Sequence, residues 1–142
     1  NMLTMQALTK GEITAHCGEH GVNLMRPNIH IEDVTEVYIW MLDHPELTGA
    51  YNAGFENISA LDTATMIAEE VEAKITVTKV KDKRSYAVDS SKLLKTGFKP
   101  RKKVRDAIFE IAAQHDIGAL VPEDRMLNLA WMRKNGLVSE AR

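Results

Sequence analysis

The stretch that decides the fold is MRPNIHIEDVTEVYIWML, residues 25–42, where a strand pattern gives way to a helix pattern. The run NIHI, 28–31, is short and apolar, and Pro27 suits the start of a strand because proline has no N–H to donate to a sheet. Asp33 follows, with a glutamate three residues later, which is a helix-capping pattern, and apolar residues then recur with helical spacing. The stretch therefore predicts a strand over 28–31 and a helix that starts at Asp33 and ends at Pro45.

Outward from this stretch, helical and strand patterns alternate along the chain. Further helices are expected over 2–9, from Ser59, over 91–95, over 104–112 and over 123–134. Further strands are expected over 13–17, 50–54 and 75–80. The fold class is therefore α/β, or α+β-like for an isolated piece. The strands are few for so many apolar helix faces, so we expect some of these faces to cover something absent from this chain.

Composition sets the broad class of the protein. The 142 residues suffice for one domain with a core, and the net charge of −2 gives no global attraction to nucleic acid or to an anionic membrane. A single cysteine, Cys17, excludes an intrachain disulfide and favours a reducing, cytoplasmic setting. No apolar run approaches the roughly 20 residues of a membrane span. The first residue is Asn1 rather than Met, so we expect upstream residues to have been lost.

One motif formally matches a metal site. HCGEH, 16–20, has the H-x-x-E-H spacing of a metallopeptidase, which requires both histidines on one helical face. Gly18 lies inside the motif and Gly21 follows it, after a strand-like run, so a loop is expected instead. The sequence therefore predicts no metal site here.

Two basic clusters have ordinary and functional interpretations. KPRKKVRD, 99–106, is expected to be a solvated helix start, since only 6% of residues are aromatic and nucleic-acid binding would need stacking side chains. KVKDKRSYAVD, 79–89, is either a strand edge protected from aggregation by its lysines or a phosphate-binding segment in which Arg84 takes part. Arg26 has the same two interpretations.

Four segments together resemble a known family. MRPNIHIEDV (25–34), GAYNAG (49–54), the capped helix from Ser59 and KRSYAVDSSKLLKTGFKP (83–100) resemble, in this order, the C-terminal half of NAD-dependent epimerase/dehydratases. These are extended short-chain dehydrogenase/reductases (SDRs) that act on nucleotide-activated sugars. The resemblance implies a sugar-nucleotide-binding C-terminal region over 1–112, of which roughly 10–112 carries the likeness. Residues 113–142 are then a helical C-terminal extension.

The resemblance also implies roles for particular residues. The family typically contacts the nucleotide diphosphate through two arginines, which match Arg26 and Arg84. His16 falls where the family often lines the nucleoside, and Tyr86 matches by position. The expected substrate is therefore a nucleotide sugar, and the expected partner is a Rossmann domain outside this chain.

The sequence departs from the family in the parts that carry out redox chemistry. Its glycines do not form the Gly-x-x-Gly-x-x-Gly loop, and no tyrosine is followed by lysine four positions later. The chain is therefore expected to supply no catalytic and no cofactor-binding residue, while NAD or NADP would bind the absent N-terminal domain. The choice between epimerase and dehydratase stays open, as does a homo-oligomer. The alternative is a free-standing, non-catalytic nucleotide-sugar-binding or assembly module.

Overall fold

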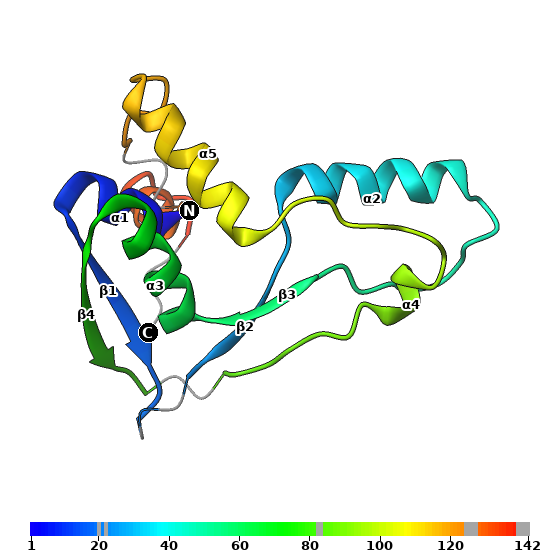
Figure 1. Ribbon diagram of the computed structural model, residues 1–142, viewed down its shortest axis with the longest axis horizontal. Helices are drawn as coiled ribbons and strands as arrows, with labels where there is room; N and C mark the ends of the chain where they lie inside the picture. The colour runs from blue at the N-terminus through cyan, green and yellow to red at the C-terminus, as the bar shows by residue number, and fades with distance from the viewer. Residues whose placement is uncertain (20, 22, 82–83, 124–127, 139–142) are drawn as a thin grey trace.

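A computed structural model describes residues 1–19, 21, 23–81, 84–123 and 128–138 (Figure 1). The helices are α1 (Met2–Lys10), α2 (Ile31–Asp43), α3 (Ala60–Val71), α4 (Ser91–Leu94), α5 (Val104–Asp116) and α6 (Asn128–Lys134). The strands are β1 (Glu12–Cys17), β2 (Met25–Asn28), β3 (Glu56–Ser59) and β4 (Lys74–Lys79). The chain is thus a mixed α/β structure, as the sequence predicted. None of its described helices is long and apolar enough to cross a membrane.

The strands form two separate pairs. β1 and β4 are parallel, with Ile13 opposite Ile75, and α3 connects β3 to β4. β2 and β3 are antiparallel, with Arg26 opposite Ile58. Figure 1 shows the second pair running from the body of α1, β1, β4, α3 and α5 toward the outlying α2 and α4.

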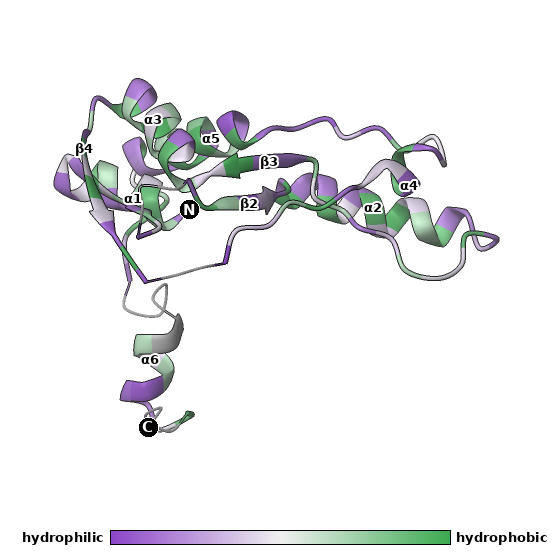
Figure 2. Cartoon of the chain, turned by 90° about the horizontal axis from the view of Figure 1, so that it is seen from below, coloured by the Kyte–Doolittle hydropathy of each residue, from purple (hydrophilic) through white to green (hydrophobic). Residues whose placement is uncertain are grey.

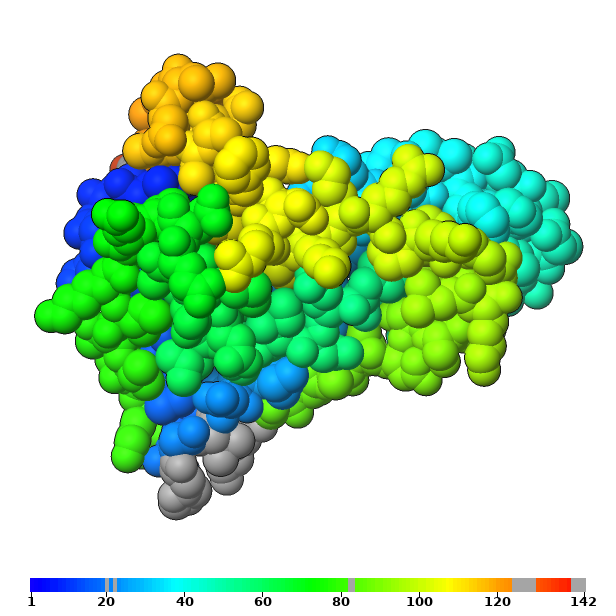
Figure 3. Space-filling model, viewed as in Figure 1, coloured from blue at the N-terminus to red at the C-terminus, as the bar shows by residue number. Residues whose placement is uncertain are grey.

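Two apolar clusters hold these parts together. The main core joins α1, β1, α3 and α5 through small and branched side chains, including Ala7, Ile13, Ala64, Ile67 and Ile108. A smaller aromatic cluster lies beneath α2. There Trp40 meets Phe98 edge-on with ring centroids 6.0 Å apart, and Phe98 stacks on Phe55 at 5.6 Å. In Figure 3 the green-yellow atoms that follow residue 84 accordingly lie against the cyan α2.

The predicted boundary between strand and helix was wrong. β2 occupies Met25–Asn28 rather than 28–31, and α2 begins at Ile31 rather than at Asp33. His30 caps the helix, because its Nδ1 accepts the backbone N–H of Glu32 at 3.2 Å. Asp33 is buried inside the first turn and accepts hydrogen bonds from another segment, so it does not cap its own helix.

The predicted strand over 50–54 was also wrong. These residues are irregular, and the strand of this region is β3, which begins at Glu56. Instead of a backbone ladder, Gly54 exchanges two hydrogen bonds with the hydroxyl of Ser90, both of 3.0 Å.

The other predicted elements are confirmed, with small shifts at their ends. Ser59 caps α3 by accepting the N–H of Asp62 at 3.0 Å, and Gly11 ends α1 in the left-handed conformation. The stripe over 104–112 belongs to α5, which continues to Asp116. Of the last predicted helix, 123–134, the structure describes α6, while 124–127 lie outside the described residues. Figure 2 shows α6 extending away from the rest of the chain.

The apolar side of α2 is only partly covered. Tyr38 and Leu42 are 69% and 80% exposed, although their four-residue spacing from Val34 puts both on the apolar face of the helix. Figure 2 shows the apolar residues of α2 as green segments on an outlying helix. Several exposed apolar side chains on one helix are a feature that marks an interaction site where they form a continuous patch.

Candidate functional site

The structure brings three of the four predicted site residues together. Arg26 lies on β2, and its guanidinium donates a hydrogen bond to the backbone carbonyl of Arg84. It also donates to the carbonyl of Met25 at 2.8 Å, and it lies over the ring of Tyr86 with 5.5 Å between the guanidinium carbon and the ring centroid. Residues from β2 and from a segment almost sixty positions later are therefore neighbours, and we call Arg26 and Arg84 the arginine pair; the ring of Tyr86 lies against the guanidinium of Arg26.

The segment that carries Arg84 and Tyr86 runs beside β2 without being a strand. This segment, residues 84–90, is irregular and is called segment 84–90 below. The backbone N–H of Met25 donates to the hydroxyl of Ser85 at 3.0 Å, and the N–H of Tyr86 donates to the carbonyl of Met25 at 3.3 Å. These bonds fix the start of the segment against the start of β2, next to Arg26.

The fourth predicted residue, His16, belongs to the other sheet. It lies on β1, opposite Thr78 of β4, and its Nδ1 is 2.7 Å from the hydroxyl oxygen of Thr78. The structure therefore places His16 on the β1–β4 pair, whereas Arg26 lies on the β2–β3 pair.

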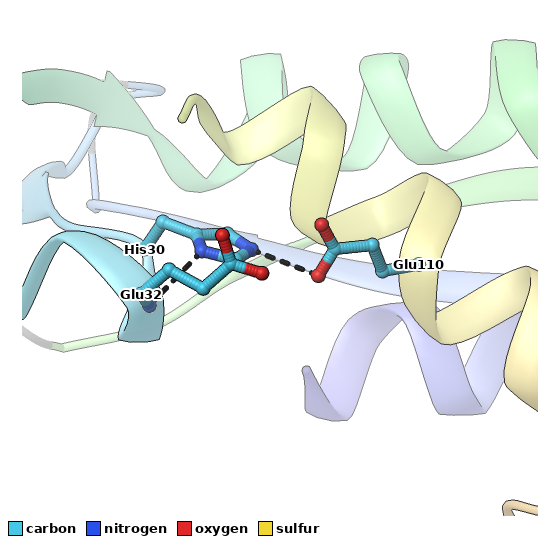
Figure 4. Close-up of side chains that lie close together, drawn as sticks. All are labelled: His30, Glu32 and Glu110. Atoms are coloured by element: carbon cyan, nitrogen blue, oxygen red, sulfur yellow. Dashed lines mark hydrogen bonds and ion pairs between the residues drawn. The ribbon is translucent and has the colours of Figure 1, made fainter. Parts of the chain in front are cut away.

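A second polar cluster, which we call the His30 cluster, joins the N-terminus of α2 to α5 (Figure 4). The Nε2 of His30 lies 3.1 Å from a carboxylate oxygen of Glu110, 80 positions later. Because Nδ1 accepts the N–H of Glu32, we assign the ring proton to Nε2, which donates it to Glu110. Lys102 completes the cluster, with its Nζ 2.6 Å from Glu110 and 3.6 Å from Glu32.

The charges of the His30 cluster stabilise one another. The hydrogen bond from Lys102 lowers the pKa of Glu110, and the same bond raises the pKa of Lys102. Sequence reasoning missed this cluster because its members are far apart in the chain. The only signal was the histidine of NIHI, within a stretch that was interpreted as a strand.

The His30 cluster has the donor types of a metal site but already contains a cation. His30, Glu32 and Glu110 present ligand atoms that lie within 4.8 Å of one another. The ammonium group of Lys102 contacts both carboxylates, so a divalent ion would have to displace a paired lysine. A groove of about 490 Å³ beside His30 and Glu110 is lined mainly by apolar residues such as Ile31, Val34 and Ile111. We therefore interpret the His30 cluster as a structural link between α2 and α5.

The two other motifs of the sequence take ordinary roles. His16 and Cys17 end the strand β1, so the helix that a metallopeptidase motif requires is not formed there, while His20 lies outside the described residues. In the basic cluster 99–106, Arg105 pairs with Glu69 at 2.6 Å.

The start of α5 holds its own anions. The N–H of Val104 donates to the carboxylate of Glu56 at 2.5 Å, and the N–H of Lys103 donates to Asp106 at 2.7 Å. The positive end of this helix dipole thus faces carboxylates of the chain itself.

Comparison with known proteins shows a likeness of fold. No protein-family model and no curated protein matches the chain. Among solved structures, ADP-L-glycero-D-manno-heptose-6-epimerase of Helicobacter pylori superposes with a TM-score of 0.61 at 21% identity, over 77% of this chain and 34% of the epimerase. RMD from Pseudomonas aeruginosa, complexed with NADPH, gives 0.55 at 18% identity, over 75% and 37% of the two chains.

A third structure gives a weaker likeness. It is MlghC, the GDP-mannoheptose C4 reductase from Campylobacter jejuni with NADP bound, at a TM-score of 0.50 and 20% identity, over 67% of this chain and 30% of the reductase. This chain therefore spans about a third of the length of each structure it resembles.

Proposed function

We propose that this chain is the substrate-binding portion of a nucleotide-sugar epimerase or dehydratase of the extended SDR type. Its part in the reaction is to hold the nucleotide diphosphate through Arg26 and Arg84. NAD or NADP binds an N-terminal Rossmann domain outside this chain and supplies the hydride transfer. The observation that supports the proposal is the hydrogen bond from the Arg26 guanidinium to the Arg84 carbonyl, since it makes neighbours of two arginines that are 58 positions apart in the chain.

The chemistry of the arginine pair suits a diphosphate. A guanidinium is planar, permanently charged and able to bind phosphate oxygens through two parallel N–H groups. Two such cations match the charge of a diphosphate, and each charge-assisted hydrogen bond contributes about 1.5–3 kcal/mol. The ring of Tyr86 beneath Arg26 restricts the orientation of the guanidinium, which lowers the entropy lost when a ligand binds.

Two further observations support the assignment to a larger enzyme. The solved structures with this fold include an ADP-heptose epimerase and a reductase named for GDP-mannoheptose, and this chain spans about a third of each. The exposed apolar residues of α2, Tyr38 and Leu42 among them, would be covered if the rest of a larger enzyme packed against this helix.

Titration calorimetry with ADP, GDP and UDP tests the proposal. We expect at least one of these probes to bind the wild-type chain, and Arg26→Ala and Arg84→Ala each to weaken that binding about tenfold or more, as loss of one charge-assisted hydrogen bond implies. Arg101→Ala is the matched control, because it removes the same charge from an exposed position while its backbone N–H still reaches Asp33. Affinity that is unchanged in Arg84→Ala contradicts the proposal.

A further inference from the structure

Segment 84–90, which carries Arg84 and Tyr86, is held mainly by side-chain hydrogen bonds, and its backbone bond from Tyr86 to Met25 does not extend into a ladder. The side-chain amide of Asn57 on β3 makes two hydrogen bonds to one residue of the segment. Its Nδ2 donates to the carbonyl of Val88 at 3.1 Å, and its Oδ1 accepts the N–H of Val88 at 3.0 Å. The amide group of Asn57 thus takes the place that the backbone of a partner strand would occupy.

The end of the segment is fixed by a side chain of its own. The buried hydroxyl of Ser90 accepts the N–H of Gly54 and donates to its carbonyl, both at 3.0 Å. Between these points the Nδ2 of Asn52 donates to the carbonyl of Asp89 at 3.1 Å. Three side-chain groups therefore fix residues 88–90 to the region around β3.

The position of the segment decides the geometry of the arginine pair. Arg26 is fixed on β2, whereas the Arg84 carbonyl that accepts its hydrogen bond lies on the irregular segment. If the segment moves away from β2, the distance between the two arginines changes and Tyr86 leaves the guanidinium of Arg26. The side chains that hold residues 88–90 thus also influence where Arg84, four residues before Val88, lies relative to Arg26 on β2.

We infer that Asn57 and Ser90 are positioning residues for diphosphate binding, which they support by holding segment 84–90 against β2 and β3. This inference rests on the proposed function. Asn57 is the better residue to test, because it is exposed, so its truncation empties no core site. Ser90 is buried, and its loss would leave the N–H of Gly54 without that acceptor.

The test measures local order and affinity in the same variants. Amide hydrogen exchange at Tyr86 and Val88 reports the order of the segment, and exchange at Ile67 in α3 reports the main core. Calorimetry with ADP, GDP and UDP reports binding. Asn57→Ala is compared with Asn135→Ala, which removes a single exposed hydrogen bond from the Asn135 side chain to the carbonyl of Trp131 near the end of α6.

In Asn57→Ala we expect faster exchange at Tyr86 and Val88, unchanged exchange at Ile67, and weaker binding of the probe. If the segment keeps the competent position a fifth of the time, binding weakens about fivefold. Asn57→Asp is expected to behave similarly, since it keeps the acceptor for the Val88 N–H but places an oxygen against the Val88 carbonyl. Asn135→Ala is expected to match the wild type in both measurements.

Failure of the inference and failure of the proposed function look different. If Asn57→Ala binds as tightly as the wild type while Arg84→Ala binds more weakly, Asn57 is not a positioning residue and only the inference falls. Unchanged exchange at Tyr86 in Asn57→Ala also overturns it. If Arg84→Ala keeps full affinity, or if the wild type binds none of the probes, the proposed function falls, and the inference falls with it.

Discussion

The buried carboxylate of Asp33 accepts a hydrogen bond of 3.1 Å from the backbone N–H of Lys102, 69 positions later in the chain. Its other oxygen accepts the N–H of Arg101 at 2.9 Å. Asp33 is 1% exposed, so these two bonds satisfy a buried charge. They also fix residues 101–102, just before α5, to the first turn of α2.

We expect Asp33→Asn to lower the free energy of unfolding by about 2–4 kcal/mol, because it weakens two hydrogen bonds to a charged acceptor and turns an amide N–H toward a backbone N–H. Urea denaturation followed by circular dichroism measures the change. Asp43→Asn at the exposed end of α2 is the control and should stay within about 0.5 kcal/mol of the wild type. A similarly small effect of Asp33→Asn would show that this link does not stabilise the fold.

Gly54 is required for steric reasons. An added Cβ would lie 2.7 Å from the Cγ2 of Val88 and 2.9 Å from the Cβ of Pro27, which is closer than real Cβ contacts. We expect Gly54→Asn to reduce the free energy of unfolding by at least about 1–3 kcal/mol, because it forces β2 and segment 84–90 apart. The comparison is Gly118→Asn, since nothing lies within 4 Å of a Cβ there and asparagine tolerates its φ of +71°. Equal stability of the two variants in urea would refute the steric account.

The pair of Lys102 and Glu110 gives stability a predictable dependence on pH. Folding lowers the pKa of Glu110 below its ordinary 4.5, so the contribution of this carboxylate is present above pH 4.5 and is lost as pH falls through the lowered value. Folding raises the pKa of Lys102 above 10.5, so its contribution is present below pH 10.5 and is lost as pH rises through the raised value.

Lys102→Met tests this dependence. We expect the variant to melt at a lower temperature than the wild type at pH 6, and the difference to be smaller at pH 3, because protonation of Glu110 is further advanced there and removes the anion that Lys102 pairs with. Scanning calorimetry at the two pH values measures it, with the exposed Lys99→Met as the charge-matched control. A difference in melting temperature that is as large at pH 3 as at pH 6 would mean that Lys102 acts through packing alone.

Local patterns predicted most of the helices and strands. They failed where a side chain that could cap its own helix is instead hydrogen-bonded by a distant segment. The Ser59 cap of α3 was predicted correctly because Ser59 and Asp62 satisfy each other. Asp33 has the same local pattern, but the N–H groups of residues 101–102 take its carboxylate, and His30 caps α2 in its place. Capping rules consider only neighbouring residues, so they cannot predict that residues 101–102 bind this carboxylate.

The site residues also divide into those that the sequence indicates and those that only the contacts between distant segments reveal. The local sequence offered a phosphate-binding interpretation for Arg26 and for Arg84 separately, and only the family resemblance joined them, because nothing in the local sequence indicates that residues 58 positions apart meet. Asn57 was not noticed, since an exposed asparagine in a short strand looks like any surface residue until Val88 is placed opposite its amide.

The most direct test of the central claim compares ligands with and without phosphates. Calorimetry would measure the affinity of the wild type, of Arg26→Ala and of Arg84→Ala for whichever of ADP, GDP and UDP binds, and for the corresponding nucleoside. If the arginine pair holds the diphosphate, each substitution weakens binding of the diphosphate about tenfold or more and leaves nucleoside binding unchanged. If the substitutions weaken diphosphate and nucleoside equally, or weaken neither, Arg26 and Arg84 do not bind the diphosphate.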